Sequence, residues 1–354
     1  MFGLTVLQFA VIIFGFGILV LVHEIGHLLG AKLFKVPVEK FTIGFGKEIV
    51  GITYKETRYS LCWIPLGGMT KLPGEDAGSA TGSPDEFLSQ AWYKRFVIAI
   101  LGPLMNYILA AIVFAIVIYF WGIASPSADS IIGSILPGKP AESAGLQAGD
   151  RILSINNKNI VKWEEMAGII YNNKNNKLKF EIKRNNKKLV INITPEHDSI
   201  TGKGIIGITP GYTIEKVGLK QSMIFGVKAC LVQSIITVRY LADKIIRWEK
   251  PEVAGPIGVA QILASAAKSG FEQILHILAI ISVALGLFNL FPIPLVDGGH
   301  IVFSLIEAIT RKPVNKKVLT VANTIGLSLI IAIFLLATYN DLSRLGLNFT
   351  KFLK

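Results

Sequence analysis

His23, Glu24 and His27 are the residues whose types and spacing most directly indicate chemistry, because they form the pattern H-E-x-x-H inside an otherwise apolar stretch. If that stretch is helical, the two histidines share one face and can bind one Zn²⁺ ion, while Glu24 beside them can deprotonate a metal-bound water. Ionisable side chains are costly at membrane depth and by default indicate a functional site there. A hydrogen-bonded polar cluster in a transporter or channel is the alternative that these residues leave open.

Asp297 is the main candidate for a third metal ligand. Catalytic zinc normally has three protein ligands and keeps its fourth position for water, so a second segment must contribute one of them. Asp297 follows Pro292 and Pro294, which lack backbone donors and open a helix, and it precedes Gly298 and Gly299, which permit close approach of the backbone. A carboxylate in this setting can turn toward the two histidines.

His300 and Glu307 compete with Asp297 for the third position. His300 follows Asp297 by three residues and could instead orient its carboxylate through a hydrogen bond. Glu307 lies in the apolar run Ile301–Ile309 and is expected to face the membrane interface. The residues by themselves leave this choice open.

The elements that must position these side chains are membrane spans. Of the 354 residues, 51% are hydrophobic and only 17% are charged, with a mean hydropathy of +0.53, whereas soluble domains carry roughly 25% charged residues. A bilayer core of about 30 Å needs about 20 apolar residues per helix. We therefore expect a multi-pass α-helical membrane protein with about four transmembrane helices, at Phe2–Val22 with its continuation to Gly30, Phe96–Trp121, Ile274–Phe291 and Val321–Tyr339.

The distribution of basic residues predicts the orientation. No Lys or Arg precedes Lys32, whereas the loop between the first two spans is rich in both and ends in Lys94-Arg95. The positive-inside rule then predicts an extracytoplasmic N-terminus, an extracytoplasmic segment between spans two and three, and an active site toward the cytoplasmic side of the membrane. The net charge of +12 is spread over loops, so it indicates contact with anionic lipids of the bilayer and no nucleic-acid partner.

The apolar stretch Ser222–Ala242 is interrupted by Lys228 and Arg239. A central Lys or Arg costs roughly 2.5–3.5 kcal/mol on insertion scales, so this stretch is expected to lie as an amphipathic helix in the membrane interface. A fifth span here is the alternative, and it would reverse the later topology.

The segment between the second and third spans contains a folded α+β module. Its opening, Gly138–Asn156, resembles the PDZ domain of bacterial proteases. Such modules bind peptide termini by adding them to a sheet edge, and Ile206, Gly207 and Ile208 are the candidate edge for that contact. An ordinary core strand is the competing interpretation of these three residues.

The first loop predicts a membrane-associated β-hairpin. The fragments Phe41–Gly46 and Tyr59–Met69 are strand-like and punctuated by glycines, including Gly67 and Gly68. An edge of that hairpin beside a membrane site could hold an unwound substrate in extended form, whereas the alternative is an amphiphilic surface hairpin.

The motifs together resemble the site-2 protease family of intramembrane metalloproteases, in particular its bacterial regulator of sigma-E protease branch. The resemblance implies one Zn²⁺ per chain held by His23, His27 and Asp297, with Glu24 as the acid/base. It also implies that Asn289, Gly67, Gly68, Pro292 and Pro294 handle the substrate. The matching segments are His23–His27, Pro65–Gly68, Gly102–Asn106, the single PDZ insert, Gly255–Gly258 and Asn289–Gly299.

The resulting expectation is an intramembrane zinc metalloendopeptidase that hydrolyses peptide bonds in or near transmembrane segments of single-pass membrane proteins, in regulated intramembrane proteolysis. The resemblance implies a place in the bacterial plasma (inner) membrane, and a membrane-bound anti-sigma factor or remnant signal peptides as substrates. The alternatives are a transmembrane metal-ion transporter that uses the His/Asp site and a membrane scaffold with structural zinc. The expected domains are residues 1–121 (two helices, the H-E-x-x-H site and the hairpin), 122–215 (the PDZ-like domain), 216–270 (the interfacial region) and 271–354 (two helices).

Overall fold

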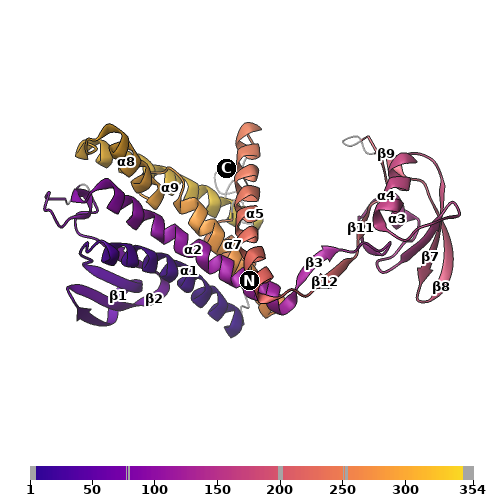
Figure 1. The fold of residues 1–354 in the computed structure, drawn as a ribbon, viewed down its shortest axis with the longest axis horizontal. Coiled ribbons are helices and arrows are strands. Elements are labelled where there is room, and N and C mark those ends of the chain that lie inside the picture. Colours follow the sequence, from indigo (N-terminus) through magenta and orange to yellow (C-terminus); the bar gives the residue numbers. More distant parts are fainter. Residues whose placement is uncertain are drawn as a thin grey trace, which may run out of the picture. The chain divides into compact units, whose positions relative to one another are not determined.

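The computed structural model describes residues 5–76, 78, 80–197, 202–249, 251 and 254–345. Residues 2–4 of the first predicted span and residues 346–354 of the last predicted domain lie outside the described residues. The chain forms two compact units, one made of Met1–Tyr119 with Gly218–Lys354 and the other of Phe120–Val217 (Figure 1). The first unit is mainly helical, and the second is mainly built from strands.

Long apolar helices dominate the first unit. Five of them are long and apolar enough to cross a membrane: α1, α2, α5, α7 and α9. The protein is therefore a multi-pass membrane protein, but the expected count of four spans is not confirmed, because α5 covers the stretch expected to lie in the interface. The helices are α1 (Val6–Leu33), α2 (Trp92–Trp121), α5 (Leu219–Ile246), α6 (Pro256–Ser269), α7 (Phe271–Asn289), α8 (Asp297–Thr310) and α9 (Lys316–Arg344).

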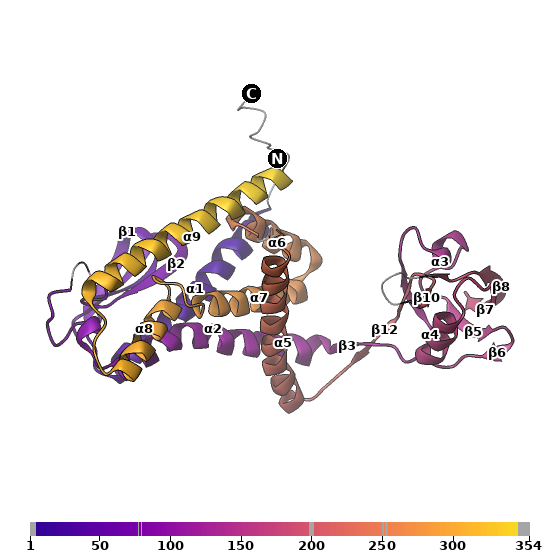
Figure 2. The same ribbon diagram turned by 90° about the horizontal axis from the view of Figure 1, so that it is seen from above.

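Small residues let α1, α2 and α7 pack closely. A Cβ atom at Gly26 of α1 would lie 2.3 Å from the Leu101 carbonyl oxygen of α2, so only glycine fits there. The Ser282 hydroxyl of α7 donates to the Asn106 carbonyl of α2 at 2.8 Å. Close backbone approach and interhelical hydrogen bonds are the usual means of association for helices in lipid, where burial of apolar surface gives little driving force. Figure 2 shows α2 and α7 running side by side.

Helices α1 and α7 run in the same direction. Near the start of α1, the Gln8 side chain donates to the Ala264 carbonyl of α6 at 3.0 Å, and α7 begins directly after α6. Further along α1, His23 meets Asp297, which follows the end of α7. The two candidate metal-ligand segments therefore meet at corresponding positions along α1 and α7.

The first loop folds as the predicted hairpin of β1 (Lys40–Tyr54) and β2 (Thr57–Lys71). The start of β1 lies between two parts of β2, since Lys40 is opposite both Arg58 and Lys71. Gly44, with φ +85°, and Gly46, with φ +90°, adopt backbone conformations that disfavour other residues, and they bend β1 back on itself. The second half of β2 thereby becomes an edge strand, and it runs along α1. A short 3₁₀ helix, η1 (Phe87–Ser89), lies in the loop before α2.

The second unit is an α+β module around a four-stranded sheet of order β6-β5-β7-β8. Its core includes Ile152, Met166, Phe180 and Ile182, all fully buried. A register shift between Ile152 and Ser154 breaks the simple alternation expected for this strand, so Ile152 and Ile155 are both buried. The other pairs are β4-β11, β3-β12 and β9-β10. The elements are β3 (Ile123–Pro126), β4 (Ile132–Ile135), α3 (Pro140–Ser143), β5 (Arg151–Ile155), β6 (Lys158–Asn159), α4 (Trp163–Asn172), β7 (Leu178–Arg184), β8 (Lys187–Ile193), β9 (Glu196–His197), β10 (Gly204–Ile205), β11 (Ile208–Pro210) and β12 (Tyr212–Glu215).

Candidate metal centre

His23, His27 and Asp297 converge on one point of the first unit. The His23 Nε2 atom lies 3.1 Å from Asp297 Oδ2, and His27 Nε2 lies 3.2 Å from Asp297 Oδ1. The two Nε2 atoms are 3.1 Å apart. Among the residues that the structure describes, these three form the one group of His, Cys, Asp and Glu with metal-binding geometry. The structure thus brings together the two histidines and the carboxylate that the sequence singled out.

The separations of these atoms fit zinc. Bonds of about 2.0–2.1 Å in a tetrahedral shell place neighbouring ligand atoms about 3.3 Å apart, close to the observed 3.1–3.2 Å. Two imidazole nitrogens and a carboxylate are ligand types that zinc prefers. Three protein ligands leave one position for water or substrate, which is the pattern of catalytic rather than structural zinc sites.

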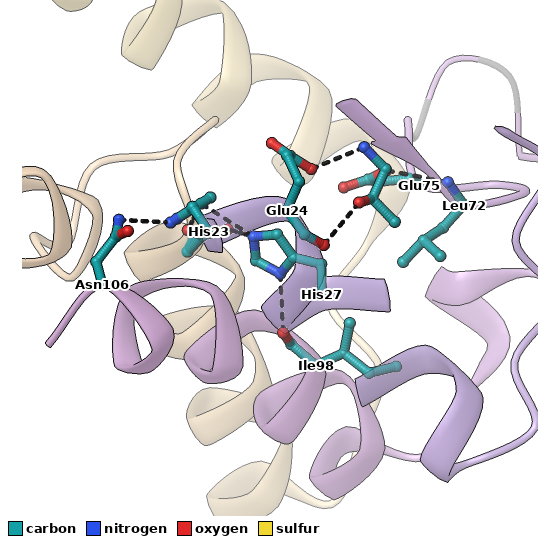
Figure 3. Close-up of polar contacts among 9 residues, drawn as sticks. His23, Glu24, His27, Leu72, Glu75, Ile98 and Asn106 are labelled. Carbon is teal, nitrogen blue, oxygen red and sulfur yellow. Dashed lines mark hydrogen bonds and ion pairs between the residues drawn. The ribbon is translucent and has the colours of Figure 1, made fainter. Parts of the chain in front are cut away.

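Helix α2 positions the ring of His27. Its Nδ1 atom lies 2.9 Å from the Ile98 carbonyl oxygen and donates to it, so the Nε2 lone pair is left for a metal (Figure 3). The ring also depends on Gly102, because a Cβ atom there would lie 2.3 Å from His27 Nε2. Gly102 therefore leaves the space that the ring occupies.

Asp297 is held by the turn between α7 and α8. Helix α7 ends at Asn289, Pro292 and Pro294 lie in the turn, and Asp297 is the first residue of α8. A Cβ atom at Gly298 would lie 1.9 Å from the Phe291 carbonyl oxygen, so this turn packs against the start of α8 too closely for any side chain. The prolines and glycines together fix the position of the Asp297 backbone, from which the carboxylate projects.

Glu24 contacts the edge of the hairpin. The Thr70 backbone N–H donates to Glu24 Oε2 at 2.7 Å, and the Thr70 hydroxyl donates to the Glu24 carbonyl oxygen at 3.0 Å. A Cβ atom at Gly68 would lie 3.4 Å from Glu24 Cγ, so this part of β2 packs on the carboxylate stem. Gly67 beside it has φ +117°. One oxygen of Glu24 is thereby fixed, while the side chain still lines the cavity described next.

A cavity of about 290 Å³ opens beside these groups, and it is lined by the three candidate ligands, Glu24 and Asn289. Glu75, which the sequence analysis did not single out, also lines this cavity. Burial raises the pKa of the Glu75 carboxyl to about 7. The cavity can therefore hold a small polar group or a peptide segment beside several carboxylates. Figure 3 shows Glu75 near Glu24 and Leu72.

The two competing ligand candidates lie elsewhere. His300 lines the cavity, but it packs edge-on against Phe87, with ring centroids 5.5 Å apart, and does not belong to the converging group. Glu307 forms an ion pair with Arg95 of α2 rather than facing the interface unpaired. Neither residue is in position to replace Asp297 in this arrangement.

The second unit has its own groove, of about 160 Å³, between α4 and residues 205–208. Ile206, Gly207 and Ile208 line it together with Trp163 and Tyr171 of α4. Ile208 already pairs with Ile135 of β4, and the side chain of Ile206 is 2% exposed and belongs to the core. These residues therefore combine a core role with a position along the groove.

Three residues at the metal centre had no assigned role in the sequence analysis: Gly102, Asn106 and Thr70. The side-chain amide of Asn106 lies 3.2 Å from His23 Nδ1 and is fully buried (Figure 3). Its signal in the sequence is an amide in the middle of an apolar span, which is costly unless it is used. Gly102 opens the matching segment Gly102–Asn106, but its contact with His27, like that of Thr70 with Glu24, joins segments that are distant in sequence.

Comparison with known proteins gives matches over nearly the whole chain. The model of peptidase family M50 matches residues 11–333. A relative from Clostridium acetobutylicum is 35% identical, covering 93% of this chain and 95% of its own, and one from Rickettsia conorii is 34% identical, covering 93% and 96%. Both carry the name "Putative zinc metalloprotease". Among solved structures, the PDZ domain of an SdrC-like protein from Listeria monocytogenes covers 25% of this chain and 93% of its own, with 24% identity and a TM-score of 0.22.

Proposed function

The chain belongs to peptidase family M50, the site-2 proteases, and from this premise we propose that it is an intramembrane zinc metalloendopeptidase acting on single-pass membrane proteins. The reaction is hydrolysis of a peptide bond in or near a transmembrane segment. Regulated intramembrane proteolysis of an anti-sigma factor or removal of remnant signal peptides would be such reactions. Zinc metalloprotease relatives and five apolar helices support the general assignment, and the geometry below supports the finer one.

The convergence of His23, His27 and Asp297 beside Glu24 is the observation that carries this proposal. His23 lies fifteen residues after Gln8, about 22 Å along α1 at 1.5 Å per residue, so the centre is deep within the helical unit. Peptide hydrolysis by zinc needs three ligands, an adjacent carboxylate and room for a substrate carbonyl. The cavity of about 290 Å³ provides that room.

The chain's own residues have separate tasks in the reaction. His23, His27 and Asp297 would hold the zinc ion, which when bound activates water and polarises the scissile carbonyl. Glu24 accepts the proton of the attacking water at the oxygen that Thr70 leaves free, and returns it to the nitrogen of the leaving amine. Asn289, on the cavity wall, donates a hydrogen bond from its amide to the substrate.

The edge of β2 is proposed to bind the substrate in extended form. Neighbouring residues of an edge strand alternately direct their backbone groups inward and outward, and Thr70 directs its N–H outward to Glu24. Gly68, two residues away, therefore presents its N–H and C=O on the same side as Glu24. Backbone pairing there replaces the helical hydrogen bonds that the substrate loses when it unwinds.

We propose four crossings, by α1, α2, α7 and α9. Phe114 near the end of α2 contacts His276 near the start of α7, with ring centroids 5.5 Å apart, and the start of α6 is held near the end of α9 by Asp341. The chain therefore leaves α2 and enters α7 on one side of the helical unit. The segment that joins α2 to α7, which includes α5, therefore begins and ends on that side. It thus adds no net crossing, and the orientation expected from the basic loops is retained, with the N-terminus extracytoplasmic and the metal centre toward the cytoplasm.

The PDZ-like unit is proposed to bind peptide termini in its groove. The groove is lined mainly by apolar side chains, such as Trp163, Met166 and Ile170 of α4, so an apolar residue at or near the end of the peptide suits it. Peptide ends of this kind arise when a substrate has already been trimmed on its outer side.

Cleavage of a single-span reporter by the purified protein in lipid nanodiscs tests the proposed function. We expect cleavage by the parent, loss on zinc chelation with recovery on zinc addition, and loss in Glu24→Gln with zinc still bound, because an amide cannot accept the proton. Cleavage at the parent rate by Glu24→Gln would contradict the mechanism. Zinc flux in proteoliposomes without any proteolysis would instead favour the transporter alternative.

The natural substrates can be found with the same variant. Membranes of cells that contain only Glu24→Gln should accumulate single-span fragments that the parent removes, which quantitative proteomics detects. A fragment set identical in the two strains would contradict the assignment of single-pass substrates.

A further inference from the structure

Asn106 occupies an unusual position beside the metal centre. It lies on α2, is fully buried, and its side-chain amide is 3.2 Å from His23 Nδ1. In the arrangement of the structure, Nδ2 faces the ring, while the buried Oδ1 has no hydrogen-bond partner among the described residues. A buried acceptor without a partner costs about 1–3 kcal/mol, so this arrangement calls for a physical reason.

The proton position on His23 decides which amide atom should face it. His23 Nε2 points at Asp297 and at His27 Nε2, with 3.1 Å to each, so Nε2 must present its lone pair if it is to bind a metal. A neutral imidazole with a free Nε2 carries its proton on Nδ1. Two N–H groups facing each other at 3.2 Å would repel, whereas an amide oxygen there accepts the Nδ1–H.

We propose that Asn106 is a positioning residue, which turns its amide by half a turn so that Oδ1 accepts the His23 Nδ1–H and holds His23 in the metal-binding tautomer. This inference rests on the proposed metal site. The turn gives Oδ1 the donor that it lacks. It leaves the position of the side chain unchanged, because the amide oxygen and nitrogen occupy nearly equivalent places.

The second histidine, His27, already has an oxygen acceptor for its Nδ1–H. His27 Nδ1 lies 2.9 Å from the Ile98 carbonyl oxygen, which can only accept. Helix α2 thus supplies one oxygen to each ring, a backbone carbonyl for His27 and the Asn106 side chain for His23. Outer partners of this kind orient a metal-binding imidazole and typically change metal affinity by about 10–100-fold when they are removed.

Zinc affinity of the full-length protein in detergent, measured by competition with a chromophoric chelator, tests the inference. Asn106→Leu, which has a similar volume and no acceptor, should bind zinc about 10–100-fold more weakly than the parent. Asn106→Asp keeps an oxygen acceptor and should stay within a few fold of the parent. Ser282→Ala is the matched control, because it removes the hydrogen bond to the Asn106 backbone and leaves the side-chain amide in place.

Parent-like affinity of Asn106→Leu would overturn the inference. Equal losses in Asn106→Asp and Asn106→Leu would overturn it too, because then the NH₂ group and not the oxygen is required.

A second measurement needs no variant at residue 106. Nitrogen-15 NMR of histidine-labelled, zinc-loaded protein, with the His23 signal assigned by its loss in His23→Gln, should show a proton on Nδ1 and none on Nε2. A His23 ring protonated at Nε2 would overturn the inference. A zinc-loaded parent that shows this tautomer but cleaves no reporter would contradict the proposed function and leave the role of Asn106 intact.

Discussion

Thr70 and Glu24 are joined by two hydrogen bonds, one from the Thr70 backbone N–H to the Glu24 carboxylate at 2.7 Å and one from the Thr70 hydroxyl to the Glu24 carbonyl at 3.0 Å. The residue proposed to move the proton is therefore fixed to the edge strand proposed to bind the substrate. A peptide that pairs with this strand is brought into register with Glu24 without any further element. This link places the edge of the hairpin at the proposed reaction centre.

Thr70→Val tests this link, because it removes the hydroxyl bond and leaves the backbone N–H. A hydrogen bond of this type is worth about 0.5–1.5 kcal/mol, so we expect kcat to fall about 2- to 13-fold with zinc content unchanged. Thr70→Ser retains both bonds and should behave as the parent in the same reporter assay. Equal activity of the valine and serine variants would show that the hydroxyl bond does not position Glu24.

Asp297→Ala is expected to lose zinc as well as activity, because it removes one of the three proposed ligand side chains from the centre. His300→Ala should retain zinc, since His300 lies outside the converging group. Metal analysis of the purified variants distinguishes the two. Full zinc content in Asp297→Ala, or its loss only in His300→Ala, would move the third ligand to His300.

Gly102→Ala should abolish zinc binding, because the new Cβ atom would lie 2.3 Å from His27 Nε2 and displace the ring. Gly168→Ala is the matched control: this helical glycine has no neighbouring atom within 4 Å of an added Cβ. It should keep zinc and gain about 0.5–1 kcal/mol in stability from helix propensity. The measurement is zinc content together with the thermal unfolding temperature, and zinc-loaded Gly102→Ala would contradict the geometry.

Asp341→Ala should destabilise the helical unit. The buried Asp341 carboxylate of α9 accepts the backbone N–H groups of Gly255 and Gly258 at 3.1 Å and 2.9 Å, which ties the start of α6 to α9. Its removal leaves two buried donors unpaired, at a cost of about 1–3 kcal/mol for each. Asp341→Asn retains one acceptor oxygen and should lose less. Thermal unfolding in detergent measures both, and an unchanged alanine variant would contradict this role.

The raised pKa of Glu75 predicts that the free energy of unfolding of the metal-free protein depends on pH. Its pKa is raised by burial from 4.5 to about 7, so the folded state binds the proton more tightly than the unfolded state between these values. The free energy of unfolding should therefore fall as the pH rises from about 4.5 to about 7, since the carboxyl must then ionise inside the protein. Glu75→Gln stays neutral and should lack this part of the decrease. Identical pH profiles of the unfolding temperature for parent and variant would exclude Glu75 as its source.

The spacing of His23, Glu24 and His27 was sufficient to predict their shared site, because residues four apart in a helix must lie on one face. The apolar runs predicted the spans for a similar local reason, since length and hydropathy decide whether a helix suits a bilayer. The prolines and glycines around Asp297 predicted a break in the helix there. Each of these conclusions depends on neighbours along the chain.

Contacts between segments that are distant in sequence decided which of the candidate residues meet. Only the structure shows that Asp297, and neither His300 nor Glu307, reaches the two histidines, because that depends on how the turn after α7 packs. Thr70 and Asn106 gained roles through strands and helices that meet at α1, and α5 is long and apolar enough to cross a membrane, although it is the least apolar of the five helices. The sequence determined which groups could do the chemistry; the tertiary structure decided which of them meet, because sub-ångström placement arises from packing that no single segment encodes.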